Sequence, residues 1–378
     1  MPADEPLILE VAIPSPLYRS FDYRAPPGQT YARSAAGMRV LVPFGRRQLV
    51  GVILATRRHT SVPGNKIKSA LRVLDSEPVL DAELMELLSW AARYYQHPIG
   101  EVIAAALPVL LRKPGRRNGT DRRVWKLTDA GRARAAGDLG RAARQARVLA
   151  QLAAHPEGLP RSALSAPLTV LRALQQKGWV SCTEASVAAA PSTSTNRSAA
   201  SLDLSDAQQQ AVTAVSNGFG SFQAFLLEGV TGSGKTEVYL RLIEPLLARQ
   251  RQVLVLVPEI GLTPQLVNRF HKRFATEIAV LHSGVNDSQR LQAWEAAAHG
   301  RAELILGTRS AIFTPLLRPG LIIVDEEHDA SLKQQEGFRY SARDLAVWRA
   351  QRLGVPVLLG SATPSLESLY NVRQGRYR

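Results

Sequence analysis

The chain has 378 residues, 45% of them hydrophobic, and a formal net charge of +15. This length and composition suit two or three domains with apolar cores and argue against a disordered or fibrous protein. The excess of Lys and Arg favours a polyanionic partner, either a nucleic acid or an anionic membrane. The longest apolar run, residues 102–111, contains Pro108 and is shorter than the ~18 residues that a spanning helix needs, so we expect no transmembrane helix.

The N-terminus and the cysteine content bear on where the protein is located. Asp4, Glu5 and Glu10 occupy the region where a secretory signal would place Lys or Arg before an apolar stretch. Cys182 is the only cysteine, so no disulfide within the chain and no cysteine-based zinc site is expected. These features favour the reducing cytoplasm.

Residues 1–108 predict a β-rich domain. Short β-branched runs separated by Pro and Gly are typical of strands and turns. The strands expected here are at residues 7–13, 38–43 and 49–54. Asp81 then precedes an amphipathic stretch at 82–95, so we expect a helix there that Asp81 caps.

Residues 109–185 combine a basic stretch with helical periodicity. Lys and Arg far outnumber acidic residues between positions 112 and 147. The expected elements are a helix at 142–153, shorter helices at 159–164 and 167–177, and a strand at 178–183. Three helices with a terminal strand are typical of a winged-helix module, in which one helix can enter a DNA groove. A helical spacer with a solvated basic face explains the same pattern equally well.

The C-terminal part of the chain predicts an α/β domain. Residues 186–201 are rich in Ala, Ser, Thr and Pro, which indicates a flexible linker. Continuous apolar strands then alternate with helical segments, at residues 224–227, 253–257, 278–281, 304–306, 321–324 and 355–359. Strands buried on both faces, with helices between them, are typical of a parallel sheet, so residues 202–378 are expected to form an α/β domain.

A phosphate-binding loop lies between the first of these strands and a helix expected at 237–247. The pattern G-x-x-x-x-G-K-[ST] is matched by Gly229, Val230, Thr231, Gly232, Ser233, Gly234, Lys235 and Thr236. Its glycines let backbone N–H groups surround a triphosphate, and the following helix N-terminus adds a favourable dipole. Lys235 would contact the β and γ phosphates, and the hydroxyl of Thr236 would ligate Mg²⁺.

The strand at 321–324 ends in a run of acidic residues. Because the carboxyl ends of parallel strands face the phosphate site, Asp325 can hold Mg²⁺ and Glu326 can orient and deprotonate an attacking water. A strand with an acidic end is common by itself. After a phosphate loop, it indicates hydrolysis of a nucleoside triphosphate.

The Asp-Glu-x-His sequence at 325–328 resembles the DEAH-type helicases of superfamily 2, and in particular the PriA family of bacterial replication-restart helicases. The motor segments that carry the resemblance are GVTGSGKTEVYL (229–240), VPEIGLTPQ (257–265), LHSG (281–284), GTRSA (307–311), DEEHD (325–329), KQQEG (333–337) and GSATP (360–364). The N-terminal segments are SFDY (20–23), VPFG (42–45), LDSEP (74–78) and YYQHPIG (94–100). The resemblance implies a RecA-like motor lobe after a β-rich DNA-binding domain and a winged-helix-like module.

The resemblance also implies roles in nucleotide chemistry. The residues placed at the catalytic and magnesium site are Lys235, Thr236, Asp325, Glu326 and His328. Gln208 would recognise adenine, which favours ATP, although a surface glutamine is an alternative interpretation. The segment formed by Ser361, Ala362 and Thr363 would couple hydrolysis to strand movement.

Two pairs of residues in the motor lobe are implied to contact single-stranded DNA. Thr308 and Arg309 match a motif that binds the strand backbone, and Arg309 can equally be a solvated charge. Phe338 and Tyr340 lie in a segment that resembles the family's aromatic-rich loop, so the resemblance implies that they stack on bases. An ordinary buried aromatic pair is the alternative.

In the N-terminal domain, the family holds the 3′ end of a nascent strand in a small pocket. The matching residues are Phe21, Asp22, Gly45 and Lys68. Phe21 would stack on the terminal base, Asp22 would accept a hydrogen bond from the 3′ hydroxyl, and Lys68 would meet a phosphate. Gly45 would permit close approach of the strand. Without the resemblance, Phe21 is interpreted as a core residue and Asp22 as a turn cap.

The implied function is that of an ATP-dependent 3′-to-5′ DNA helicase that recognises stalled forks and initiates primosome assembly. Its cofactors would be ATP and Mg²⁺, and its partners branched and single-stranded DNA, single-stranded DNA-binding protein and primosome proteins, in the cytoplasm and nucleoid. Family members continue with a second motor lobe and cysteine-rich zinc sites. Neither is among these 378 residues, so we expect this chain to bind ATP and DNA but to hydrolyse ATP poorly.

Two other functions stay open on sequence grounds. A P-loop kinase or transporter ATPase shares the phosphate loop but does not need the segments at 325–328 and 360–363, and DNA would not stimulate its ADP release. A non-catalytic DNA-binding scaffold would keep both its fork binding and its biological activity after the substitution Lys235→Ala.

Overall fold

The computed structural model describes residues 7–26, 35–115, 123–135, 143–155, 158–160, 164, 168–184 and 203–378. The chain forms two compact units. The first unit combines Met1–Arg117 with Thr195–Arg378, and the second is Asn118–Ser194. The predicted linker at 186–201 lies outside the described residues. No helix in the described ranges is long and apolar enough to cross a membrane.

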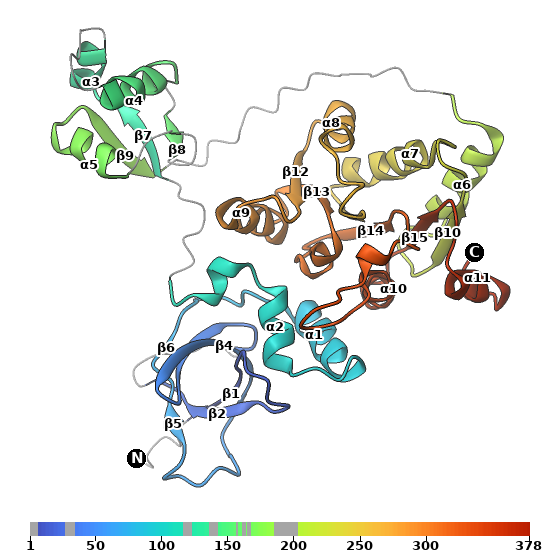
Figure 1. Ribbon diagram of the computed structural model, residues 1–378, viewed down its shortest axis with the longest axis horizontal. Coiled ribbons are helices and arrows are strands. Elements are labelled where there is room, and N and C mark those ends of the chain that lie inside the picture. The colour runs from blue at the N-terminus through green and yellow to red at the C-terminus, as the bar shows by residue number, and fades with distance from the viewer. Residues whose placement is uncertain are drawn as a thin grey trace. The chain divides into compact units, whose positions relative to one another are not determined.

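The first unit begins with a six-stranded sheet that curls around an apolar core (Figure 1). Its strands are β1 (Ile8–Ala12), β2 (Phe21–Arg24), β3 (Arg39–Phe44), β4 (Arg47–Arg57), β5 (Lys68–Ser69) and β6 (Arg72–Val73), in the order β5-β2-β1-β4-β3-β6. All neighbours are antiparallel except β2 and β5. Leu9, Val11, Val40 and Val42 are fully buried in it, which confirms the predicted β-rich domain.

Two helices and a short 3-10 helix follow this sheet: α1 (Ala82–Tyr94), α2 (Ile99–Ala106) and η1 (Val109–Arg112). Asp81 caps α1 as predicted, because its side chain accepts a hydrogen bond from the Leu84 N–H. Helix α2 packs directly on the chain after β1. A Cβ atom on Gly100 would lie 1.7 Å from the carbonyl oxygen of Ile13, so only glycine fits there.

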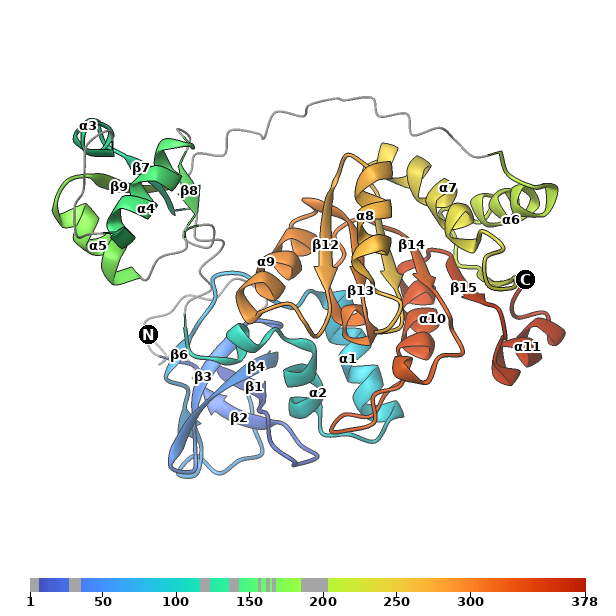
Figure 2. The ribbon, with the colours of Figure 1, turned by 45° about the horizontal axis from the view of Figure 1, so that its top comes forward.

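The rest of the first unit is a parallel sheet with helices on both faces (Figure 2). Its strands are β10 (Ala224–Glu228), β11 (Gln252–Leu256), β12 (Glu277–Leu281), β13 (Ala302–Gly307), β14 (Pro319–Val324) and β15 (Val357–Ser361), in the order β10-β15-β14-β11-β13-β12. Every adjacent pair is parallel, and all six strands coincide with predicted ones. The predicted α/β fold class with a parallel-sheet lobe is therefore confirmed.

The helices of this lobe are α6 (Asp206–Ser216), α7 (Lys235–Ala248), α8 (Pro264–Arg273), α9 (Asp287–Ala298), α10 (Ala342–Leu353) and α11 (Leu366–Arg373), with the 3-10 helices η3 (Arg309–Phe313) and η4 (Ala330–Leu332). One face of the sheet packs against α7 and α8. The other packs against α9, α10 and η3, and its core continues into α1 and α2. One apolar cluster is therefore shared by α1, α2 and the motor lobe, while the N-terminal sheet also has a core of its own.

A buried ion pair joins the two parts of this unit. The guanidinium of Arg349, on α10, lies 2.7 Å from the carboxylate of Glu83 on α1 and donates a 2.6 Å hydrogen bond to the carbonyl oxygen of Ile312. The Arg349 side chain is fully buried. Beside it, the rings of Trp90 and Trp348 stack with their centroids 4.9 Å apart.

In its described residues, the second unit is a small antiparallel sheet with three helices. Its elements are β7 (Arg123–Leu127), α3 (Asp129–Ala135), α4 (Ala143–Ala153), β8 (Leu159–Pro160), α5 (Leu168–Gln176) and β9 (Val180–Glu184), and the sheet order is β8-β7-β9. Trp125, Val148 and Leu171 are in its core. The sequence predicted α4, α5 and β9 but missed β7 and α3. The prediction of a helix beginning at Leu159 was wrong, because Leu159 pairs with Trp125 in the sheet.

The ion pair between α1 and α10 predicts a large loss of stability for Arg349→Met. The substitution leaves the Glu83 carboxylate without its partner in a mostly buried position, at a cost of about 3–5 kcal/mol. The matched control is Arg352→Met, whose ion pair with Glu86 lies at the surface and contributes less than about 1 kcal/mol. Urea unfolding of both variants measures the difference. Equal unfolding midpoints would contradict a structural role for the buried pair.

Candidate functional site

The phosphate loop links the carboxyl end of β10 to the first turn of α7. Gly232 and Gly234 have φ angles of 82° and 84°, in the left-handed region that other residues rarely adopt. A Cβ atom on Gly234 would also lie 2.4 Å from the side-chain nitrogen of Gln208. Two of the loop glycines are therefore required by the backbone path that leads into the helix.

Lys235 is held at the centre of the loop. Its Nζ donates a 2.8 Å hydrogen bond to the Gly229 carbonyl oxygen and lies 3.4 Å from Oε1 of Glu326. The lysine side chain is largely buried, with 9% of its surface exposed. The structure thus brings the predicted phosphate-binding lysine and the predicted catalytic glutamate together, although they are far apart in the sequence.

Asp325 follows the last residue of β14 at the same edge of the sheet. Burial raises the pKa of its carboxyl group, and a 2.8 Å hydrogen bond from the Tyr239 hydroxyl to Oδ1 partly offsets that effect. Tyr239 is buried on α7, one helical turn after Lys235, and a Cβ atom on Gly360 would lie 1.8 Å from its hydroxyl. Sequence analysis did not assign Tyr239 to the site. The sequence did hold one signal for Tyr239: it lies four residues after Lys235, and that spacing places both side chains on one face of a helix.

Glu326 has a strained backbone. Its φ of 45° lies in the left-handed region, which costs a non-glycine residue about 1–3 kcal/mol and persists only where the surroundings hold it. This turn aims the Glu326 carboxylate at Lys235, while the next residue, Glu327, points the other way. Glu327 is buried and accepts hydrogen bonds from Arg343, Ser365 and Ser368. No local pattern in the sequence indicates this anchoring role of Glu327.

His328 connects the acidic strand end to the segment at 361–363. Its Nδ1 lies 2.7 Å from the hydroxyl oxygen of Ser361, and that oxygen accepts a 3.0 Å hydrogen bond from the Thr363 N–H. His328 Nδ1 also lies 3.7 Å from the Glu326 carboxylate. A hydrogen bond thus links His328, predicted to take part in catalysis, to Ser361 of the predicted coupling segment, and Glu326 lies close to this pair. Ala362 is the residue between the two hydrogen-bonding positions.

Gln208 lies beside the phosphate loop. Its side-chain nitrogen donates a 2.9 Å hydrogen bond to the Ser233 carbonyl oxygen, and its side-chain oxygen accepts one from the Ser205 N–H at the start of α6. The side chain thus joins α6 to the loop. Its proposed contact with adenine stays a prediction.

Magnesium suits the oxygen ligands available at this edge. Mg²⁺ is usually bound by one or two carboxylates together with phosphate oxygens, so the Asp325 carboxylate and the Thr236 hydroxyl fit it with a bound triphosphate. Within the described residues, no cluster of three or more His, Cys, Asp and Glu side chains could hold a metal ion by itself.

Arg309 and Thr308 differ in their surroundings. Thr308 is buried at the end of β13. Arg309 is partly exposed and donates hydrogen bonds to the Gln334 side chain at 2.7 Å and to the Ser331 carbonyl oxygen at 3.1 Å. The arginine predicted to contact the DNA backbone is therefore tied to the loop that follows the acidic strand end.

The prediction that Phe338 and Tyr340 stack on bases needs correction, because both side chains are buried in this structure. Their rings stack on each other with centroids 5.0 Å apart, and Phe313 packs edge-on against Tyr340. Tyr95, which follows α1, packs on Phe338, and its hydroxyl oxygen accepts a hydrogen bond from the Ser341 N–H. The pair thus belongs to an aromatic cluster inside the unit and presents no face for a base.

A cavity of about 530 Å³ lies on the N-terminal sheet, apart from the nucleotide site. Phe21, Asp22, Gly45 and Lys68 all line it, so the four residues predicted to hold a 3′ end come together from three separate segments. The Phe21 ring meets Phe44 edge-on at 5.2 Å. Asp22 accepts a short 2.5 Å hydrogen bond from the Thr60 hydroxyl.

The cavity is richer in positive charge than the sequence suggested. Arg19, Arg57 and Lys66 also line it, and the Arg19 guanidinium lies 5.0 Å from the centre of the Phe21 ring. The sequence offered only a weak signal for these residues, which are spread over more than forty positions of the chain, on loops and at the end of β4. A Cβ atom on Gly45 would meet nothing within 4 Å, so its φ of 58° explains the glycine better than close packing does.

Comparison with known proteins matches both parts of the first unit. Residues 10–108 match the PriA 3′ DNA-binding domain, and residues 205–372 match the DEAD/DEAH box helicase domain. A solved structure of RecG bound to a three-way DNA junction resembles 46% of this chain over 23% of its own length, at 24% identity and a TM-score of 0.36.

Curated relatives match along nearly the entire sequence. The replication restart protein PriA of Haemophilus influenzae is 44% identical over 98% of this chain and 51% of its own length. The replication restart protein PriA of Bacillus subtilis is 33% identical over 95% of this chain and 53% of its own length. The chain thus spans about half the length of these relatives, and it belongs to the PriA family of replication restart proteins, with a 3′ DNA-binding domain and a helicase domain.

Proposed function

We propose that this chain binds Mg·ATP at the phosphate loop and holds the 3′ end of a DNA strand in the cavity of the N-terminal sheet. The observation that carries the proposal is the meeting of Lys235, Glu326, His328 and Ser361 at one edge of the parallel sheet. Lys235 supplies positive charge for the phosphates, Glu326 a base for the attacking water, and Ser361 a hydroxyl that links hydrolysis to movement. A nucleotide-driven motor needs all three.

Each residue of the nucleotide site has a role that its surroundings support. The loop N–H groups and Lys235 bind the phosphates, and binding releases Lys235 from the Gly229 carbonyl oxygen. Thr236 and Asp325 hold Mg²⁺, which neutralises phosphate charge when bound. Glu326 orients the attacking water and accepts its proton, in a position that the strained backbone fixes.

The whole protein's activity follows as a broader proposal. A replication-restart helicase of this family would translocate 3′ to 5′ on single-stranded DNA with ATP, recognise stalled forks and start primosome assembly. Single-stranded DNA-binding protein and primosome proteins would be its partners, in the cytoplasm and nucleoid. The matched 3′ DNA-binding and helicase domains support DNA as the substrate.

The nucleotide site predicts that Lys235→Ala weakens Mg·ATP binding by about tenfold or more, because charged hydrogen bonds to phosphate are lost. Titration with a fluorescent ATP analogue measures the affinity. Lys272→Ala on α8, an exposed lysine away from the loop, is the matched control and should bind as the wild type does. The Lys235 variant should lose ATP binding but still bind forked DNA as the wild type does. Unchanged affinity for ATP in this variant would contradict the proposed nucleotide site.

The DNA-end cavity predicts that the chain binds a fork with a free 3′ hydroxyl about tenfold more tightly than one with a 3′ phosphate. Asp22→Asn should remove this preference, because the carboxylate is the acceptor for the hydroxyl. Fluorescence anisotropy with both forks measures it, and Glu77→Gln, at an exposed position outside the cavity, should keep the preference. Equal affinity of the wild-type protein for both forks would refute the assignment of Asp22.

A further inference from the structure

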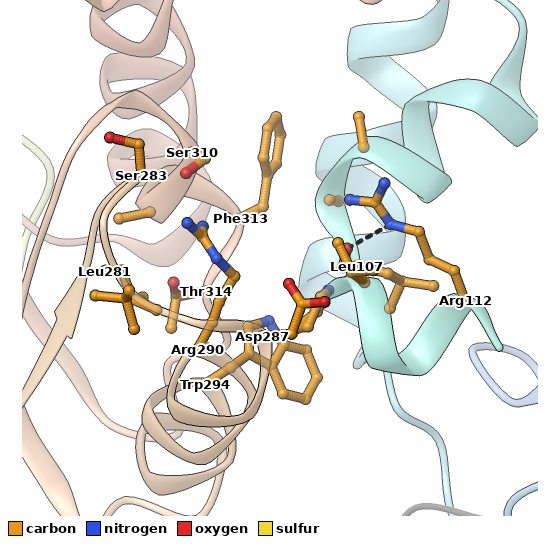
Figure 3. A pocket seen from close by; sticks show the side chains of 16 residues that line it. Leu107, Arg112, Leu281, Ser283, Asp287, Arg290, Trp294, Ser310, Phe313 and Thr314 are labelled. Atoms are coloured by element: carbon orange, nitrogen blue, oxygen red, sulfur yellow. Dashed lines mark hydrogen bonds between the residues drawn. The ribbon is translucent and has the colours of Figure 1, made fainter. Parts of the chain in front are cut away.

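A second site is formed where the N-terminal domain meets the motor lobe. A cavity of about 280 Å³ opens between η1 and the chain that follows β12 and β13 (Figure 3). Its apolar wall includes Leu107, Leu281 and Phe313, and its polar lining includes the hydroxyls of Ser283, Ser310 and Thr314. Phe313 also packs on Tyr340, but no ligand contact has been assigned to any of these residues above.

Two arginines face this cavity from opposite sides. Arg112 comes from η1 and Arg290 from α9, and Figure 3 shows their guanidinium groups on opposite sides of the cavity. Arg112 Nε donates a 2.9 Å hydrogen bond to the Leu107 carbonyl oxygen, and Arg290 donates one of 2.6 Å to that of His282. Each guanidinium is thus fixed by one bond to a carbonyl oxygen and keeps further N–H groups for a ligand.

The position of η1 is fixed by the sheet behind it. Arg39, which is fully buried, donates a 3.0 Å hydrogen bond to the Leu111 carbonyl oxygen and forms an ion pair of 2.7 Å with Asp75. Leu111 is itself buried. Arg112 therefore presents its charge from a rigid element.

The charge of the cavity favours an anion. Within the described ranges, neither arginine forms an ion pair, and the one carboxylate in the lining is that of Asp287. Burial and then the positive charge of Arg290 lower the pKa of Arg112, whereas Asp287 raises it in part. Two guanidinium groups against one carboxylate leave a net positive charge for a ligand to neutralise.

We propose that this cavity binds one phosphate of a DNA strand, with its sugar against the apolar wall, and that Arg112 and Arg290 are the phosphate ligands. Arginine suits this role because its planar fork matches phosphate oxygens in pairs. The volume is near the lower end of the roughly 300–1,000 Å³ of small-ligand pockets, so a single nucleotide unit fits.

The place of the cavity in the fold points to a strand as the source of the phosphate. Ser283 and Ser310 follow β12 and β13 at the carboxyl edge of the sheet, and Ser310 is next to Arg309, the proposed contact for single-stranded DNA. A strand on the motor lobe would therefore reach Arg112 of the N-terminal domain. This inference rests on the proposed DNA-binding function and adds a contact shared by both domains.

Single-stranded oligothymidylate binding across salt concentrations tests the inference. Arg112→Gln and Arg290→Gln should each weaken binding about tenfold. Because both arginines contact the same phosphate, replacing both together should reduce the slope of log affinity against log salt by about 0.7, the value for one lost phosphate contact on a single strand. Lys113→Gln is the matched control, since Lys113 is an exposed neighbour that does not line the cavity, and it should change neither quantity as strongly. Arg112→Lys should recover part of the affinity.

Several outcomes would overturn the proposal. Wild-type affinity in both glutamine variants, an equal loss in Lys113→Gln, or weaker binding with an unchanged salt slope would exclude a phosphate contact at the cavity. If free thymidine monophosphate competed with the strand and bound with the same affinity as the strand, the cavity would be assigned to a free nucleotide instead. Absence of any strand binding by the wild-type protein would count against the proposed DNA-binding function itself, whereas thermal unfolding of the variants separates misfolding from lost contacts.

Discussion

The parallel alignment of six strands is the constraint on which the candidate nucleotide site depends. Because all six strands run in one direction, the loops after β10, β14 and β15 meet at one edge. Lys235 begins α7 after the first of these loops, Glu326 lies in the second and Ser361 ends β15, so residues far apart in the sequence meet at this edge. The burial of apolar side chains on both faces of the sheet fixes that arrangement.

Hydrogen bonds and packing connect the same edge to the residues of the proposed DNA contact. His328 joins the acidic strand end to Ser361, and Arg309 joins the end of β13 to the loop containing Gln334. That loop continues into the aromatic cluster around Phe338, on which Tyr95 of the N-terminal domain packs. Nucleotide chemistry, the proposed strand contact and the N-terminal domain thus lie along one continuous path of contacts.

Sequence patterns predicted the elements that have a simple local signature, such as a continuous apolar run or a fixed spacing of glycines. The six parallel strands are continuous apolar runs, and the phosphate loop has a fixed spacing of glycines, so both could be located without the structure. The short strands β2, β5 and β6 were missed because two to four residues carry too little periodicity. The strand β7 and helix α3 were missed because a basic composition obscured them.

The environment of individual side chains was harder to predict, since it depends on long-range packing. Nothing local in the segment around Phe338 and Tyr340 shows that Tyr95, more than two hundred positions earlier, covers their rings. The partners of Glu327 and the hydrogen bond from Tyr239 to Asp325 likewise require the assembled sheet. Family resemblance identified the four residues of the DNA-end cavity, but the extra arginines there became visible only in three dimensions.

The central claim is that the end of β14 and the phosphate loop form a magnesium–nucleotide site. Titration of ATP with and without Mg²⁺, on the wild-type chain and on Asp325→Asn, tests it most directly. We expect Mg²⁺ to tighten binding by the wild-type chain by about tenfold or more and to have little effect on the variant, because the carboxylate ligand is lost. Equal dependence on Mg²⁺ in both proteins would contradict the account.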